Sequence, residues 1–402
     1  MGDRHLNFHE IRDNLTHRPL GIDSGPGRRP LHFALVTSSM EKTSVARLDS
    51  LTSLRFLAAL LVFGAHADRQ LNEHIQTLLI RAPLFSGSLG VSFFYLLSGF
   101  VLTWSLRPDD TARSFYWRRF GRIYPSHFVV WVGTLALLLT VFHEKQDVGT
   151  ILPSLTLTQA WWPDAHVIRG VNGVAWSLSA EFFFYACFPL VVRGVRALGH
   201  RRLLLMAALV ALVVGVDVLI AMTVDLESLS DPRSVLDWLV YNSPAFRVTE
   251  FVLGVCLAQE FIEGRRVKIG LAPAIALVGV GLYVAGLTRH AHLCVGLTLI
   301  PFMLVISAAA GRDVAGKPTL LHRRFFVRLG EWSFAFYLVH QLVLRLGAKL
   351  QVDSIAMMLA WLAVQFCFAL AAAAALHYLV ERPAERRIRL RLAARRAEPV
   401  AV

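Results

Sequence analysis

The sequence predicts an all-α, polytopic integral membrane protein, and three observations carry this prediction. Of the 402 residues, 55% are hydrophobic and 17% are charged, which is less charge than a soluble globular protein of this length carries. The apolar residues gather in ten blocks, several of them near the ~20 residues that a helix needs to cross a bilayer. The lysines and arginines cluster between these blocks, so the net charge of +13 indicates membrane topology rather than nucleic-acid binding.

The segments expected along the chain are a polar N-terminal tail, one short segment that does not cross the membrane, and ten transmembrane helices. Residues 1–46 are polar and lack an apolar core, so we expect a disordered cytoplasmic tail rather than a signal peptide, and Met40 is a second candidate start. The segment 148–162 is too short and polar to cross, and its tryptophans favour the membrane interface. The ten predicted transmembrane helices are 51–67, 88–106, 124–142, 174–192, 203–222, 245–262, 269–288, 292–310, 329–348 and 355–379.

The basic residues orient these helices. The loops predicted to be cytoplasmic, together with both chain ends, hold 31 of the 41 lysines and arginines, and the outer loops hold 7. This bias predicts that both termini of the multi-pass protein are cytoplasmic. Residues 47–385 then form one membrane domain, and 386–402 form a basic cytoplasmic tail. We expect Pro383 to end the last helix after Glu381.

Two polar side chains in the first predicted helix are candidates for function. Arg55 and His66 are eleven residues apart, which places them on one helical face, three turns plus about 20° apart and roughly 16 Å along the axis. A charge inside an apolar span normally faces the protein interior or a wet cavity. We therefore expect both to line one internal pocket, Arg55 toward the cytoplasm and His66 toward the outside. The alternative is a snorkelling arginine and a histidine satisfied by a neighbour.

The fourth predicted helix carries a carboxylate about two turns into the membrane. Glu181 shares a stripe with Ser177 and Tyr185, four residues to either side. A carboxylate at that depth needs a partner or a raised pKa. One interpretation is a structural ion pair with a buried arginine. The one we favour is that Glu181 orients and charges an imidazole, as in base-plus-orienter sites of acyl transfer.

Further candidates lie on other segments. Arg118, Arg119 and Arg122 form a cluster, with Arg118 and Arg122 on one helical face; such arginines suit phosphate recognition or simply set topology. His340 lies near mid-membrane and is either a satisfied core histidine or a catalytic one.

Other features are read as structural. Arg247 and Glu250, three residues apart, predict an intrahelical pair, and the small residues Gly90, Ser98 and Gly99 predict close helix packing. The four cysteines stand singly in apolar segments without a CxxC spacing. This predicts neither a metal site nor a disulfide framework, and we expect all four to be buried filler.

Seven stretches in order resemble the acyltransferase 3 family, the O-antigen acetylase-like membrane acyltransferases, over roughly residues 46–385. Across FFYLLSGFVLTWS and WRRFGRIYP the chain is similar to the branch that acylates macrolide antibiotics in actinomycetes. The family's Arg-x10-His signature falls on Arg55 and His66, and its Trp-Ser-x-x-x-Glu motif runs from Trp176 to Glu181. The seven stretches are RLDSLTSLRFLAALLVFGAH, GVSFFYLLSGF, RRFGRIYP, WSLSAEFFFYACFPL, RVTEFVLG, LGEWSFAFYLVH and the final ERP.

The resemblance implies an acyl-CoA co-substrate, no bound cofactor, and a hydroxyl acceptor on a glycoside or macrolide; a cell-envelope polysaccharide is the alternative. It implies that the three clustered arginines hold CoA phosphates and that Arg55 guides the donor. His66 would be the general base and Glu181 would stabilise its imidazolium, with direct transfer and an acyl-histidine intermediate both open. Further candidates to line the cavity are Trp176, Ser177, Tyr185 and His340.

A different class of function would use the same buried groups. A proton-coupled transporter could hold an arginine, a histidine and a glutamate inside ten helices. Against it, the sequence shows no related halves and no paired helices broken by glycine or proline.

Overall fold

Helices account for nearly all of the chain that the structure describes, and no β-strand occurs within it. The computed structural model describes residues 47–70, 87–107, 110–223, 235–288, 293–350 and 354–397, which all belong to one unit, Val45–Val402. The predicted N-terminal tail, the alternative start at Met40 and the last five residues lie outside the described residues.

Ten long helices overlap the ten predicted spans, one for one, within the described residues. By length and apolarity seven of the described helices can cross a membrane, so the chain is a polytopic helical membrane protein. Helix α12, for example, falls outside that criterion because it carries three charged side chains. The ten are α2 (Asp49–Ala67), α4 (Gly87–Trp104), α5 (Ala112–Thr140), α8 (Trp176–Ala197), α9 (Arg202–Thr223), α12 (Pro244–Ile262), α13 (Leu271–Thr288), α14 (Leu293–Val314), α15 (Arg324–Gly347) and α16 (Ile355–Leu376).

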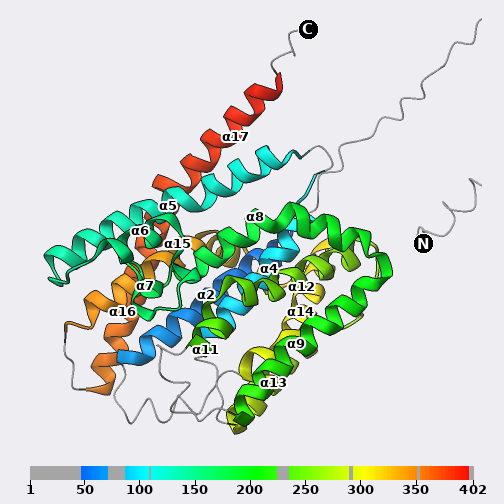
Figure 1. Ribbon diagram of the computed structural model, residues 1–402, viewed down its shortest axis with the longest axis horizontal. Coiled ribbons are helices and arrows are strands. Elements are labelled where there is room, and N and C mark those ends of the chain that lie inside the picture. Colours follow the sequence, from blue (N-terminus) through cyan, green and yellow to red (C-terminus); the bar gives the residue numbers. More distant parts are fainter. Residues whose placement is uncertain are drawn as a thin grey trace, which may run out of the picture. The chain divides into compact units, whose positions relative to one another are not determined.

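The centre of the bundle is built on α2, which packs between α4 and α15 (Figure 1). On one side α4 continues the packing to α12 and α12 to α8, and on the other α15 continues it to α16. Helices α13 and α14 pair with each other. Helix α2 packs against both α4 and α15, and α8 also touches α4, so side chains from all four helices can converge on one interior region.

Glycines allow the central helices to approach closely, as predicted for Gly90 and Gly99. A Cβ on Gly99 would lie 2.1 Å from the Phe251 carbonyl oxygen of α12, and one on Gly254 would lie 2.0 Å from the Leu96 carbonyl oxygen of α4. The α4–α12 contact is therefore reciprocal, and only glycine fits at either position. Small residues serve membrane helices in this way because they let backbones touch.

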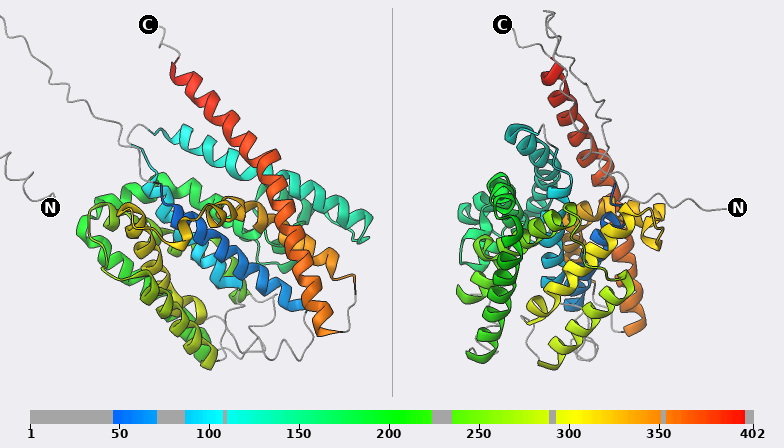
Figure 2. Two further views of the ribbon diagram at one scale, coloured as in Figure 1. Left: turned by 180° about the vertical axis from the view of Figure 1, so that it is seen from behind. Right: turned by 90° about the vertical axis from the view of Figure 1, so that its right-hand side faces the viewer.

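Helix α5 begins twelve residues before the predicted span, so the arginine-rich segment is its first part rather than a loop. The expected break at Pro383 is wrong, because α16 passes through the π-helical turn η7 (His377–Glu381) into α17 (Arg382–Ala397) (Figure 2). Pro383 stands in the first turn of α17, where a missing N–H is tolerated, and the preceding π-turn changes the hydrogen-bond register. Helix α17 lies beside α5.

The remaining segments are short. The stretch predicted for the interface folds as α6 (Val148–Thr156) and the 3-10 turn η3 (Gln159–Trp161), followed by α7 (Ala165–Arg169). Helix α11 (Val235–Asp237) and a π-turn (Trp238–Asn242) precede α12, and short 3-10 turns, η1 (Asp68–Gln70), η4 (Gly199–Arg201) and η6 (Leu320–His322), flank α2, α9 and α15. The interfacial position of the first stretch stays a prediction.

Two smaller predictions have definite outcomes. The Arg247–Glu250 pair is confirmed, with 3.2 Å between Nη2 and Oε2 and both side chains buried. The expectation that all four cysteines are buried filler is wrong for Cys367, which is exposed, and only partly right for Cys187, while Cys256 is buried. Hydropathy places a residue in a span but does not say whether it faces a neighbouring helix or the lipid.

Candidate active site

A cavity of about 290 Å³ lies among α2, α4, α5, α8 and α15, and we call it the arginine cavity. Nine of its sixteen lining residues carry charged or hydroxyl groups, and the other seven are apolar. These polar lining residues are Arg55, Arg119, Arg122, Glu181, Tyr185, Ser98, Tyr95, Ser177 and Tyr337. The structure therefore brings Arg55, two of the clustered arginines and the Ser177–Glu181–Tyr185 stripe to one place.

The three arginines of this cavity are neutralised unequally. Arg122 pairs with Glu385 of α17 at 2.9 Å and lies 3.9 Å from Glu381. Arg119 has no ion pair within the described chain; its Nε is buried without a hydrogen-bond partner, and its guanidinium lies 5.9 Å from the centre of the Tyr185 ring.

Arg55 likewise makes no hydrogen bond or ion pair to any residue that the structure describes. Glu181 is the one carboxylate among the lining residues. The cavity thus holds an excess of positive charge that suits a multiply charged anion.

The predicted cluster of three arginines needs correction. Arg118 does not line the cavity, because its guanidinium pairs with Asp110 at 2.9 Å, before α5 begins. The pair that faces the cavity is Arg119 and Arg122, with i, i+3 spacing, instead of Arg118 and Arg122 with i, i+4 spacing. Both spacings put two side chains on one helical face, so the sequence could not choose between them.

Glu181 does not contact His66, and the expected pairing of the two also needs correction. The Glu181 carboxylate accepts hydrogen bonds from the Ser98 hydroxyl at 3.2 Å and from the Tyr185 hydroxyl one turn along α8. His66 instead places Nδ1 3.0 Å from Nε2 of His340. The partner of His66 in this structure is therefore a second histidine and not the predicted carboxylate.

His66 lines a different region, a cavity of about 410 Å³ and an adjoining one of about 190 Å³. We call these two together the histidine cavity, because His66, Arg169, Gly173 and Gln341 border both. Trp176 lines the smaller part, with its ring centre 5.2 Å from that of Tyr241. The expectation that Arg55 and His66 share a single chamber is therefore wrong for this structure.

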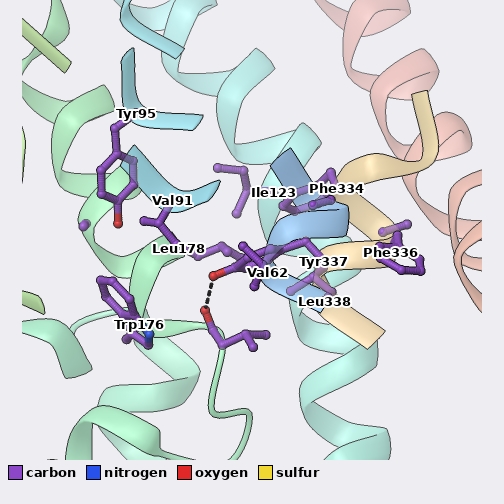
Figure 3. Packing of buried hydrophobic residues seen from close by; sticks show 14 of the residues in the cluster. Val62, Val91, Tyr95, Ile123, Trp176, Leu178, Phe334, Phe336, Tyr337 and Leu338 are labelled. Atoms are coloured by element: carbon purple, nitrogen blue, oxygen red, sulfur yellow. Dashed lines mark hydrogen bonds between the residues drawn. The ribbon is translucent and has the colours of Figure 1, made fainter. Parts of the chain in front are cut away.

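Packed side chains separate the two cavities. Ala59 and Val62 lie on the face of α2 between Arg55 and His66, and both are buried. Val62 belongs to the same hydrophobic cluster as Leu178 of α8 and Tyr337 and Leu338 of α15, and Figure 3 draws all four. Arg55 and His66 both lie on α2, as predicted, but the face of the helix between them is covered by packed side chains and does not line a continuous cavity.

Tyr337 and His340 were not paired by sequence reasoning, although both stand one turn apart on α15. Tyr337 lines the arginine cavity, and its hydroxyl lies 2.6 Å from Ser177 Oγ and donates to the Val174 carbonyl oxygen at 3.1 Å. Its own carbonyl oxygen accepts from His340 Nδ1 at 2.7 Å. His340 is fully buried and lines neither cavity. The sequence signal that could have indicated this link is the i, i+3 spacing of Tyr337 and His340, which puts both on one face of an apolar helix.

Comparison with known proteins places the chain in a family. A family model described as an acyltransferase domain matches residues 48–378. The chain is 36% identical over 363 residues to acyltransferase MdmB of Streptomyces mycarofaciens, covering 85% of this chain and 92% of the relative.

More distant relatives match only part of the chain. One is a Staphylococcus aureus (strain COL) protein named provisionally as an O-acetyltransferase, 29% identical over 36% of this chain and 24% of its own. Another is nodulation protein 10 of Rhizobium leguminosarum bv. viciae, 31% identical over 35% of this chain and 42% of its own. No solved structure matches significantly. The family match across most of a helical membrane chain shows that this protein belongs to the acyltransferase 3 family.

Proposed function

We propose that the protein is an acyl-CoA-dependent O-acyltransferase of a bacterial plasma membrane. It binds the donor through the arginine cavity and transfers an acetyl or short acyl group to a hydroxyl of a glycoside or glycosylated macrolide in the histidine cavity. The observation that carries the proposal is the pair of guanidiniums, Arg55 and Arg119, that face one cavity without an ion-pair partner in the described chain.

The donor side is supported by charge. CoA carries several phosphate charges, and arginine binds phosphate with paired, charge-assisted hydrogen bonds. In this proposal Arg55 and Arg119 bind phosphate directly, while Arg122 is held in place by Glu385. The positive-inside pattern of the loops puts α5's first turns at the cytoplasmic surface, where acyl-CoA is made.

The acceptor side is supported by the lining of the histidine cavity. It combines hydrogen-bonding groups such as Arg169, Asn172 and Gln341 with the rings of Trp176 and Tyr241. Hydroxyl-rich ligands with an apolar face, such as sugars, match that combination of polar groups and aromatic surface. The partial match to a protein named provisionally as an O-acetyltransferase also favours a hydroxyl as the acceptor.

The chemistry follows from the position of His66. His66 takes the proton of the acceptor hydroxyl, the oxygen attacks the thioester carbonyl, and the C–S bond breaks to release CoA as its thiol, which recovers the proton. A transient acyl-histidine would use the same side chain. For the thioester to reach His66, the donor must extend from the arginine cavity past Tyr337, which lines that cavity and contacts Ser177.

The test compares two neighbouring arginines. We expect Arg119→Ala to raise KM for acetyl-CoA about 10-fold, because one charge-assisted contact contributes roughly 1.5–3 kcal/mol and part of it is screened. Arg118→Ala is the matched control, since Arg118 pairs with Asp110 outside the cavity. The assay is CoA release from acetyl-CoA by purified protein in proteoliposomes, with a glycosylated macrolide or octyl glucoside as the acceptor.

The outcomes separate the alternatives. Acceptor-dependent CoA release that Arg119→Ala weakens and Arg118→Ala does not weaken would support the proposal. If both variants change KM for acetyl-CoA equally, the arginines do not bind the donor specifically, and their role is to set the membrane topology. No CoA release with either acceptor, in protein that remains folded, would contradict this acceptor class and favour a cell-envelope polysaccharide instead.

A further inference from the structure

His340 holds a position in which its protonation state can be worked out from geometry. Its Nδ1 lies 2.7 Å from the carbonyl oxygen of Tyr337 and 3.3 Å from that of Phe336, on its own helix. A carbonyl oxygen only accepts hydrogen bonds, so Nδ1 must carry the hydrogen. His340 is 0% exposed and forms no ion pair with any carboxylate in the described chain, so its neutral form is strongly favoured over a buried imidazolium.

A neutral His340 with hydrogen on Nδ1 has a lone pair on Nε2. That nitrogen lies 3.0 Å from Nδ1 of His66, and one of the two must donate. Since His340 Nε2 has no hydrogen to give, His66 Nδ1 is the donor. When the His66 ring is neutral, its lone pair is therefore on Nε2, the ring nitrogen that does not contact His340.

We propose that His340 is a positioning residue that holds His66 in the Nδ1–H tautomer, so that Nε2 is the ring nitrogen that can act as a base in the histidine cavity, which His66 lines. The chain of bonds runs from His66 Nδ1–H to His340 Nε2, and from His340 Nδ1–H to the Tyr337 carbonyl oxygen. The arrangement does for His66 what a buried carboxylate does in a serine-hydrolase triad, which is to fix the tautomer and orientation of the base.

The tautomer assignment stands on the hydrogen bonds, whereas its role in catalysis rests on the proposed function. Both proton abstraction and acyl-histidine formation need an unprotonated ring nitrogen that faces the substrate. The packing around His340 also fixes the ring: it stacks on Phe336 with 5.9 Å between centres and 17° between planes. This stacking on Phe336 limits rotation of the His340 ring and so keeps its Nε2 in place to accept from His66.

The first test does not depend on turnover. Full-length protein labelled with 15N-histidine is studied by NMR in detergent micelles or nanodiscs, and the His66 signals are assigned by their loss in His66→Gln. We expect the nitrogen shift of a protonated Nδ1 and of an unprotonated Nε2. The reverse assignment at His66 in the wild type would overturn the proposal.

The second test measures transfer from acetyl-CoA to the acceptor that the wild type uses. His340→Leu removes the acceptor for His66 Nδ1–H, and we expect kcat to fall about 10- to 100-fold, the range found when a metal-bound histidine loses its outer hydrogen-bond partner, with both KM values nearly unchanged. His340→Gln keeps an oxygen acceptor at a similar reach and is expected to restore much of the lost kcat.

The outcomes distinguish this inference from the proposed function. If His66→Ala abolishes transfer while His340→Leu keeps wild-type kcat, His340 has no positioning role and the proposed function stands. If the NMR assignment is as expected but the wild type transfers no acyl group, the tautomer stands and the catalytic role falls with the proposed function. Should His340→Leu fail to fold, the wild-type NMR assignment and the kcat of His340→Gln decide.

Discussion

Gly254→Ala is a direct test of the close α4–α12 contact and of its importance for the arginine cavity. The new Cβ would lie 2.0 Å from the Leu96 carbonyl oxygen and 2.9 Å from its carbonyl carbon. Ordinary carbon–oxygen contacts are about 3.3 Å, so the two helices must separate locally by roughly 1 Å. Overpacking of this kind costs about 1–3 kcal/mol, partly offset by a gain of up to about 1 kcal/mol from the better helix propensity of alanine.

The controls for this change are already in the chain. Gly133 in α5 and Gly194 in α8 have no atom within 4 Å of a Cβ, so alanine there should leave stability unchanged or raise it slightly. The assay is the thermal unfolding midpoint of purified protein in one detergent, followed by tryptophan fluorescence. We expect Gly254→Ala to unfold below the wild type and both controls to unfold at or above it.

A functional readout follows from the same contact. Helix α4 carries Ser98, which donates to Glu181 in the arginine cavity, so a shift of α4 should also raise KM for acetyl-CoA. Gly99→Ala should act similarly, and the double variant should cost less than the sum, because one separation of the helices relieves both clashes. A Gly254→Ala protein as stable as Gly194→Ala would refute the close packing of these helices.

Two further changes address the charges in the interior. We expect Glu181→Gln to lower KM for acetyl-CoA, because it removes the one carboxylate among the described lining of the arginine cavity; an unchanged KM with a large loss of kcat would assign Glu181 to the chemistry instead. Glu250→Leu should destabilise the protein by about 3–5 kcal/mol, because it leaves the buried Arg247 without its partner, and Arg247→Leu/Glu250→Leu should unfold at a higher temperature than Glu250→Leu alone.

The sequence located the helices well, because hydrophobic blocks of membrane length are a strong signal. It also identified Arg55, Arg119, Arg122 and Glu181, which the structure gathers around one cavity. Buried charges in apolar spans are rare enough to be recognised without knowing their partners.

What the sequence did not determine is which side chains meet. Glu181 was predicted to orient an imidazole, and the family resemblance pointed to His66, but the Glu181 carboxylate contacts Ser98 and Tyr185 instead. The sequence left His340 open as a core or a catalytic histidine, and only the packing of α15 against α2 shows that it contacts His66. Helical periodicity fixes a residue's position along one helix, whereas contacts between helices depend on how each is rotated about its own axis.

The separation of the two cavities has a physical advantage for the proposed reaction. When His66 accepts a proton it becomes a cation, and at about 4 Å from an unpaired arginine it would be opposed by roughly 4 kcal/mol at an effective dielectric constant of about 20. At the roughly 16 Å that eleven helical residues provide, the same repulsion is about 1 kcal/mol. The contact with His340 adds no further charge repulsion to protonated His66, because His340 is uncharged in the proposed arrangement. A site that must bind an anionic donor with free guanidiniums and also run a histidine base is therefore better built as two cavities than as one.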